Sequence, residues 1–148
     1  MNLTKYTDYG FRVLTYLALL PKSQLTSVDE LSEVYNISRN NLNKIVHQLS
    51  KAGVVQTKKG KGGGLKLAMP AELVNLGQLL ELMESTLDVV DCQKPICKIA
   101  PACQLKSILA EATKAFIEVL KQYSLADLTS NKNNDLKALL QIPIVLEQ

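Results

Sequence analysis

The chain has 148 residues, a hydrophobic content of 47% and a net charge of +3. This length fits one domain or a small domain with an extension, and the hydrophobic content is sufficient for a packed core. Residues 1–70 hold ten Lys and Arg against four Asp and Glu, whereas residues 71–148 hold seven against ten. The basic amino-terminal half indicates a polyanionic partner.

The most apolar run near the start, residues 13–21, does not have the properties of a membrane anchor or a leader peptide. It is too short to span a bilayer, Asp8 and Arg12 precede it closely, and Pro21 lies where a small-residue cleavage site would be needed. We therefore expect a cytoplasmic protein with no membrane contact.

The first predicted element is a helix from about Leu3 to Leu20, because apolar residues recur there at helical spacing and Pro21 follows. A second, short helix is predicted over residues 28–35. It begins with a capping box, in which the Ser27 hydroxyl takes a free amide and the Glu30 side chain reaches back to Ser27.

A tight turn at residues 36–37 leads to a longer predicted helix, capped by Ser38, that runs to about Ala52 and is ended by Gly53. Two helices joined by a tight turn, the second amphipathic and basic, indicate a helix-turn-helix. The stripe expected to be buried in the second helix consists of Leu42, Ile45, Val46 and Leu49.

A glycine-rich basic segment follows between two short predicted strands, residues 54–57 and 65–67. The tip, Lys58–Gly64, is typical of the wing of a winged helix. After it, Asn75 is expected to cap a helix over residues 76–84.

The recognition helix and the wing supply the candidate DNA contacts. Asn can bond adenine, and Lys can contact guanine or phosphate. The start of a helix suits phosphate, and wing lysines can neutralise the DNA backbone. A solvated basic face on a protein-interaction winged helix is the alternative. The candidates are Ser38, Arg39, Asn40, Asn43, Lys44 and His47 in the helix and Lys58, Lys59 and Lys61 in the wing.

Three cysteines, Cys92, Cys97 and Cys103, lie in a predicted loop at about residues 88–103, spaced C-x4-C-x5-C. They are the three cysteines of the chain. In a reducing cytosol such a cluster indicates metal or redox chemistry rather than a disulfide. The spacing favours an iron–sulfur site over zinc, which usually takes CxxC pairs with a fourth ligand. A zinc-stabilised interaction module and inert or redox thiols stay open at this point.

A long helix is predicted at about residues 104–123, with an apolar heptad seam that has no evident cover in the remaining chain. A second copy of the chain would cover it, giving a homodimer; packing on its own domain is the alternative. Residues 130–135 read as flexible. The predicted architecture is mainly α, with a winged helix-turn-helix domain at 1–70, and the cysteine loop, a dimerisation helix and a tail at 71–148. The seam consists of Leu105, Leu109, Ala112, Phe116, Val119 and Tyr123, and Ile108 and Leu120 widen it.

Several motifs together resemble the NsrR and IscR family of iron–sulfur winged-helix regulators, over nearly the whole chain. They are TDYGFRVLTYLALLP, SRNNLNKIVHQLSKAGVV, GKGGGLKL, the cysteine triad ending in PAC, and YSLADL. The resemblance to the NsrR type implies a homodimeric repressor on a pseudo-palindromic operator. It also implies one [4Fe-4S] or [2Fe-2S] cluster per protomer, whose nitrosylation by nitric oxide releases the DNA and derepresses detoxification genes.

The resemblance also bears on the fourth cluster ligand. The IscR type uses a His shortly after the third cysteine, and residues 104–107 contain none. The NsrR type uses an Asp from the first helix of the other protomer, which makes Asp8 the candidate. Asp91, water and a small thiol are rivals, and Arg12 is expected to steady Asp8. An IscR-like regulator sensing cluster supply or redox state is the alternative function. No acid–base pair or cofactor fingerprint of an enzyme is present.

Overall fold

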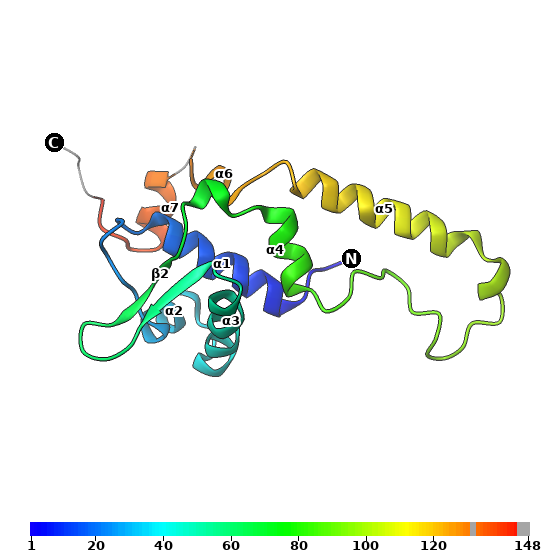
Figure 1. The fold of residues 1–148 in the computed structure, drawn as a ribbon, viewed down its shortest axis with the longest axis horizontal. Helices are drawn as coiled ribbons and strands as arrows, with labels where there is room; N and C mark the ends of the chain where they lie inside the picture. The colour runs from blue at the N-terminus through cyan, green and yellow to red at the C-terminus, as the bar shows by residue number, and fades with distance from the viewer. Residues whose placement is uncertain (131–132, 145–148) are drawn as a thin grey trace.

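The structure is a computed structural model, which describes residues 1–130 and 133–144. Within these residues it is built mainly of α-helices with one small hairpin (Figure 1). The α-helices are α1 (Lys5–Leu19), α2 (Val28–Tyr35), α3 (Arg39–Lys51), α4 (Leu76–Met83), α5 (Gln104–Leu120), α6 (Leu125–Thr129) and α7 (Asn133–Leu139). The strands are β1 (Val55–Lys58) and β2 (Gly64–Leu67), and the short 3-10 turns are η1 (Ala71–Leu73) and η2 (Ala100–Ala102).

Helix α1 is the centre of the fold. The Thr4 hydroxyl caps its start by accepting a hydrogen bond from the Thr7 amide, and Pro21 follows its end. Val13, Leu14 and Leu17 are buried along it. It packs against α3, α4, α6, α7 and β2. This central position brings parts of both halves of the sequence into one core.

The helix-turn-helix forms as predicted. Asn36 takes the left-handed conformation between α2 and α3, with φ of 53°. The hydroxyls of Ser27 and Ser38 cap the two helices, and the predicted stripe of α3 is buried. The wing hairpin is also present, so the prediction of a mainly α winged helix-turn-helix is confirmed.

One half of the predicted capping box at the start of α2 is wrong. The Ser27 hydroxyl accepts from the Glu30 amide at 3.0 Å. However, the Glu30 carboxylate accepts hydrogen bonds from the hydroxyl groups of Tyr16 and Thr26 instead of from Ser27. These two partners come from α1 and from the segment before α2, so only the tertiary packing makes them available.

The wing hairpin pairs Val55 with Leu67 and Lys58 with Gly64 in an antiparallel register. Thr26 forms an isolated antiparallel β-bridge with Leu65 of β2. Its amide donates to the Leu65 carbonyl at 3.0 Å, and its carbonyl accepts from the Leu65 amide at 2.7 Å. A Cβ atom on Gly64 would collide with the Thr26 carbonyl. Glycine at this position therefore permits the close approach that ties the wing to the body of the domain.

The carboxyl-terminal part differs in places from the prediction. Asn75 caps α4 as expected, by accepting from the Gln78 amide at 3.0 Å. The long helix α5 ends at Leu120 instead of Tyr123. Residues 133–135, predicted to be flexible, are the first turn of α7, while 131–132 lie outside the described residues.

Helices α6 and α7 were not foreseen in the sequence. Ser124 and Asp127 form a reciprocal capping box that begins α6, with the Ser124 amide donating to the Asp127 carboxylate at 2.6 Å. Leu125 and Ile142 are buried in the main core. The predicted division at residue 70 stays a prediction, and α4 and α6 both contact elements of the first seventy residues.

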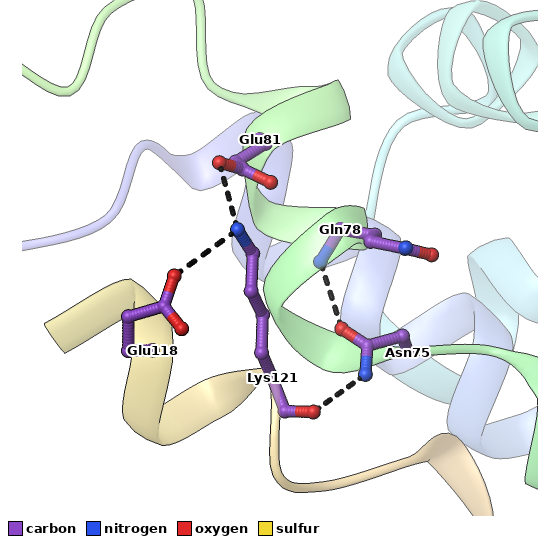
Figure 2. A network of polar contacts seen from close by, with 5 residues as sticks. All are labelled: Asn75, Gln78, Glu81, Glu118 and Lys121. Carbon is purple, nitrogen blue, oxygen red and sulfur yellow. Dashed lines mark hydrogen bonds and ion pairs between the residues drawn. The ribbon is translucent and has the colours of Figure 1, made fainter. Parts of the chain in front are cut away.

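Helix α5 extends away from the other helices, and the segment between α4 and α5 runs out to its far end (Figure 1). Its carboxyl-terminal end is attached to the start of α4. Asn75 donates from Nδ2 to the Lys121 carbonyl at 2.8 Å, and the Lys121 ammonium lies between Glu81 and Glu118, at 3.5 and 3.4 Å (Figure 2). None of the helices in the described ranges is long and apolar enough to cross a membrane.

Candidate nucleic-acid interface and cysteine segment

The outward face of α3 carries a row of polar and basic side chains. Asn40, Asn43, Lys44 and His47 are all exposed, whereas the opposite face is buried against the core. The spacing of three and four residues places them along one side of the helix. Their amide, ammonium and imidazole groups are therefore free to meet an external partner.

The start of α3 is capped as predicted, and it makes one ion pair that was not predicted. The Ser38 hydroxyl accepts from the Asn41 amide at 3.2 Å, so it serves as the helix cap. Arg39 is exposed, and its Nε lies 2.6 Å from Oδ1 of Asp29 in α2. Asp29 was not among the predicted site residues, because it is ten residues away in sequence and no local pattern links the two.

The wing presents a second group of cations. Lys58 ends β1, and Lys59 and Lys61 lie in the exposed turn that follows. Gly60 and Gly62 have φ of 87° and 73°, a backbone region that favours glycine, so they allow the tight reversal at the tip. The turn thereby projects lysines beyond the two short strands.

The recognition helix α3 is also bonded to the last turn of α4. Gln48 donates from Nε2 to the Leu82 carbonyl at 2.8 Å. Tyr6 of α1 donates from its hydroxyl to the Lys44 carbonyl at 3.2 Å. The cysteine-bearing segment leaves α4 directly after this turn, so α3 and that segment share an attachment point. The sequence carries no signal for these contacts.

The cysteine segment is a series of turns. The Cys97 amide donates to the Cys92 carbonyl at 3.1 Å, and the Cys103 amide donates to the Ala100 carbonyl at 3.4 Å. All three thiols are free and half-buried. In the described part of the chain, no three His, Cys, Asp or Glu side chains are gathered closely enough to hold a metal ion. The thiols thus share one segment without converging on a point.

The two candidate carboxylates near this chemistry have partners of their own. Asp8 forms a bidentate ion pair with Arg12 one turn later in α1, at 3.0 Å to Nε and 2.7 Å to Nη2. The hydrogen bond that Arg12 donates to Asp8 raises the pKa of Arg12, against a smaller lowering by burial. Asp91 accepts from the amides of Gln93 and Lys94, at 2.8 and 3.2 Å. Asp91 therefore shapes the loop, while Asp8 is held on the surface of α1.

The predicted apolar seam of α5 is largely uncovered. Leu105, Ile108 and Val119 are 54, 58 and 53% exposed, whereas Ile117 on the inner side is buried. A groove beside the seam is lined by residues 1–3, by the segment after α4, and by Leu109 and Phe116 of α5. Exposed apolar surface of this kind usually marks an interaction site.

Comparison with known proteins identifies the family. The family model Rrf2, described as an iron-dependent transcriptional regulator, matches residues 3–131. The chain belongs to the Rrf2 family. Two relatives are named HTH-type transcriptional regulator NsrR. The protein from Shouchella clausii is 45% identical over 144 residues, covering 95% of this chain and 96% of that protein. The protein from Halalkalibacterium halodurans is 43% identical over 145 residues, covering 96% and 99%.

Solved structures share the fold of this Rrf2 protein. CymR (YrzC), the global cysteine regulator of B. subtilis, has a TM-score of 0.68 and 24% identity, covering 88% of this chain and 97% of that chain. IscR from T. potens has a TM-score of 0.69 and 22% identity, covering 99% and 94%. The family and the fold together identify a transcriptional regulator with a winged helix-turn-helix.

Proposed function

We propose that this protein is a homodimeric repressor that binds a pseudo-palindromic operator and releases it in response to nitric oxide. The signal would be received at an iron–sulfur cluster held by Cys92, Cys97 and Cys103 of each protomer. The relatives named NsrR, at 43 to 45% identity over nearly the full chain, support this specific function within the Rrf2 family.

The observation that carries the DNA-binding part is the exposed row on α3 beside a lysine-bearing wing. Asn40 and Asn43 have the bidentate amide that matches adenine in the major groove, and Lys44 can bond guanine or phosphate. Lys58, Lys59 and Lys61 would neutralise the phosphate backbone on the flank. His47 lies on the same face and would contact the same groove.

The uncovered seam of α5 supports the dimer. A second copy of α5 would bury the exposed part of its leucine, isoleucine and valine side chains. Because Leu105, Ile108 and Val119 are already about half buried, each would contribute about half of the ~1.5–3 kcal/mol of full burial. A twofold dimer also presents two recognition helices to a pseudo-palindromic site, with half-sites about 34 Å or a multiple apart.

The donor set of the cysteine segment fits an iron–sulfur cluster. Three thiols free of disulfides offer soft thiolate ligands, and the Rrf2 model is described as iron-dependent. A cluster bound there would supply iron that reacts with nitric oxide. The chain's own part is to hold the three thiolates in one segment between α4 and α5 and to shield them with Ile96 and Ile99, which are exposed in the isolated chain.

Asp8 of the partner protomer is the proposed fourth ligand. Its ion pair with Arg12 holds the carboxylate in a fixed rotamer on the outside of α1. An aspartate oxygen is a harder, more readily exchanged ligand than a thiolate. Arg12 would hold the carboxylate in one orientation on the surface of α1, ready to meet the cluster of the other protomer.

The test combines spectroscopy with DNA binding. The chain is reconstituted anaerobically, its absorption spectrum is recorded, and operator affinity is measured by fluorescence anisotropy before and after nitric oxide is added. We expect a brown protein whose affinity falls about 5- to 150-fold, the usual range of allosteric coupling. Unchanged affinity would contradict nitric-oxide sensing. If nitric oxide leaves the affinity unchanged but removal of the cluster lowers it, the result would instead support sensing of cluster supply.

Variants separate the ligands. Cys97→Ser is expected to abolish or strongly weaken cluster binding. Asp8→Ala should shift the spectrum without preventing reconstitution, whereas Asp91→Ala should change loop stability and leave the spectrum unaltered. The reverse result for the two aspartates would assign the fourth ligand to Asp91. A colourless, zinc-containing protein would overturn the iron–sulfur proposal altogether.

A further inference from the structure

The ion pair between Arg39 and Asp29 joins the first turns of the two helices of the helix-turn-helix. Oδ1 of Asp29 lies 2.6 Å from Nε of Arg39, and the two side chains are 68 and 66% exposed. An exposed pair of this kind contributes little to stability. Because the pair lies at the start of the recognition helix, a role in DNA binding explains its presence better than a role in stability.

Arg39 is in a position that is unfavourable for the helix itself. It is the first residue of α3, whose first turn contains no acidic residue. The amino-terminal end of a helix carries partial positive charge, so a cation there is disfavoured. Local rules are typically broken at functional sites, which indicates that Arg39 is there for an external partner. Asp29 supplies the missing negative charge from the neighbouring helix.

The geometry leaves one edge of the guanidinium available. Asp29 engages Nε, whereas the two terminal nitrogens have no ion-pair partner in the ranges that the structure describes. A guanidinium has five donors in a rigid fork, and two parallel donors match the O6 and N7 atoms of guanine. A carboxylate beside Nε therefore leaves the edge formed by the two terminal nitrogens available as a bidentate donor.

Asp29 is placed differently from the other acids of α2. Glu30 is used by Tyr16 and Thr26. Glu33 is exposed and has no ion pair in the described part of the chain. Of these three acids, Asp29 is the one that forms an ion pair with the recognition helix in the ranges that the structure describes.

We propose that Asp29 is a specificity-determining residue, which orients Arg39 to read a base edge and reduces its attraction to phosphate on DNA of any sequence. This inference rests on the proposed DNA-binding function. Without Asp29, Arg39 becomes one more mobile cation that pairs with the nearest phosphate. The affinity for DNA of any sequence then rises, and the preference for the operator sequence falls.

The experiment uses the full chain and two duplexes. One is the duplex that the wild-type chain selects from a randomised pseudo-palindromic library, and the other is a scrambled duplex of the same composition. Asp29→Asn should lower the ratio of selected to scrambled affinity by about fivefold or more, the lower end of the value of one bidentate base contact. The slope of log affinity against log salt should steepen by about two, as expected for one added phosphate contact in each protomer of the dimer.

Further variants separate the effect of the Asp29–Arg39 pair from the effect of removing one negative charge. Glu33→Gln removes the same charge from the same helix and should raise both affinities alike, leaving their ratio unchanged. In an Arg39→Ala background, Asp29→Asn should behave like Glu33→Gln. Asp29→Glu, which retains a carboxylate, should recover part of the ratio.

The outcomes distinguish the inference from the function on which it rests. Equal effects of Asp29→Asn and Glu33→Gln on the ratio would overturn the specificity role and leave DNA binding intact. Selection of no sequence by the wild-type chain would overturn the proposed function and this inference with it. A fall in the ratio that persists in the Arg39→Ala background would show that Asp29 acts without Arg39, which also contradicts the proposal.

Discussion

Gln48 of the recognition helix donates a hydrogen bond from Nε2 to the main-chain carbonyl of Leu82, at 2.8 Å, in the last turn of α4. The carbonyl groups at the end of a helix lack partners within the helix, so they accept bonds from elsewhere. The cysteine segment begins just beyond this turn, and Glu84 at its edge accepts from the amide and hydroxyl of Thr4, at 2.8 and 3.1 Å. A displacement of the segment that moved Leu82 and Glu84 would therefore alter the contacts to α3 and to the start of α1.

Gln48→Leu should remove this link while retaining the size of the side chain. We expect the free energy of unfolding to fall by about 0.5–1.5 kcal/mol, the net value of one hydrogen bond, as measured by urea denaturation. The ratio of operator affinities before and after nitric oxide should move toward one. Gln78→Leu, on the exposed side of α4, is the matched control and should alter neither quantity appreciably. A normal affinity ratio in Gln48→Leu would exclude this contact as a route of coupling.

Gly10→Ala should destabilise the contact between α1 and α4. A Cβ atom on Gly10 would overlap Sδ and Cε of Met83, which is buried. Overpacking of this kind costs about 1–3 kcal/mol. Met83→Ala alone should cost about 2–5 kcal/mol through loss of a buried side chain.

The double variant Gly10→Ala with Met83→Ala tests the contact itself. Because the added methyl group partly fills the space that Met83 leaves, the double variant should lose less stability than the sum of the two single losses. Urea denaturation gives all three values. Strict additivity would mean that Gly10 and Met83 do not share this space.

Asn75 has two structural roles, a helix cap and a hydrogen bond to α5, that different substitutions can separate. Its Oδ1 caps α4, and its Nδ2 bonds the Lys121 carbonyl at the end of α5 (Figure 2). Asn75→Asp keeps the cap and loses the donor, so the free energy of unfolding should fall by about 1 kcal/mol. Asn75→Ala loses both the cap and the donor, so its free energy of unfolding should fall by about 2 kcal/mol.

Gln78→Glu is the control for the change from amide to acid. The Gln78 side chain points away from this network (Figure 2), so its substitution should change stability by less than about 0.5 kcal/mol. Wild-type stability in Asn75→Asp would mean that the bond to Lys121 does not help to hold α5 on α4.

Tyr16 gives the fold a pH dependence on the alkaline side. Burial, followed by the hydrogen bond to the Glu30 carboxylate, raises the pKa of Tyr16 from 10.0 to about 12. The folded state thus retains this proton longer than the unfolded state. The associated stability is fully present below about pH 10 and is lost as the pH rises through 12.

Absorbance at 295 nm checks this titration. Burial also raises the pKa of Tyr35 to about 12. Burial raises the pKa of Tyr6 as well. The wild-type chain should therefore show tyrosines that ionise late, and Tyr16→Phe should show one fewer of them. Complete ionisation of all five tyrosines by pH 11, with the helical circular dichroism signal intact, would contradict the buried environment of Tyr16.

Local patterns in the sequence accounted for the amino-terminal elements because the determinants there are short-range. The hydroxyls of Ser27 and Ser38 each bond an amide three residues later, and the stripe from Leu42 to Leu49 has helical spacing. Helix α6, which was not predicted, has an equally local signal, Ser124 followed three residues later by Asp127. Glu30 was misassigned because its partners in the fold, Tyr16 and Thr26, compete successfully with the local backbone amide.

The sequence by itself determined the helix-turn-helix, the wing, the outward row on α3 and the grouping of three cysteines in one segment. Each depends on spacing within about a dozen residues, which the backbone periodicities convert into position on a helix or hairpin. Only the tertiary structure decided that Asp29 meets Arg39, that Gln48 meets the end of α4, and that Asn75 holds the end of α5. These contacts join elements whose relative placement is set by burial of apolar side chains around α1, and hydrophobic burial is non-directional, so their polar partners cannot be read from local pattern.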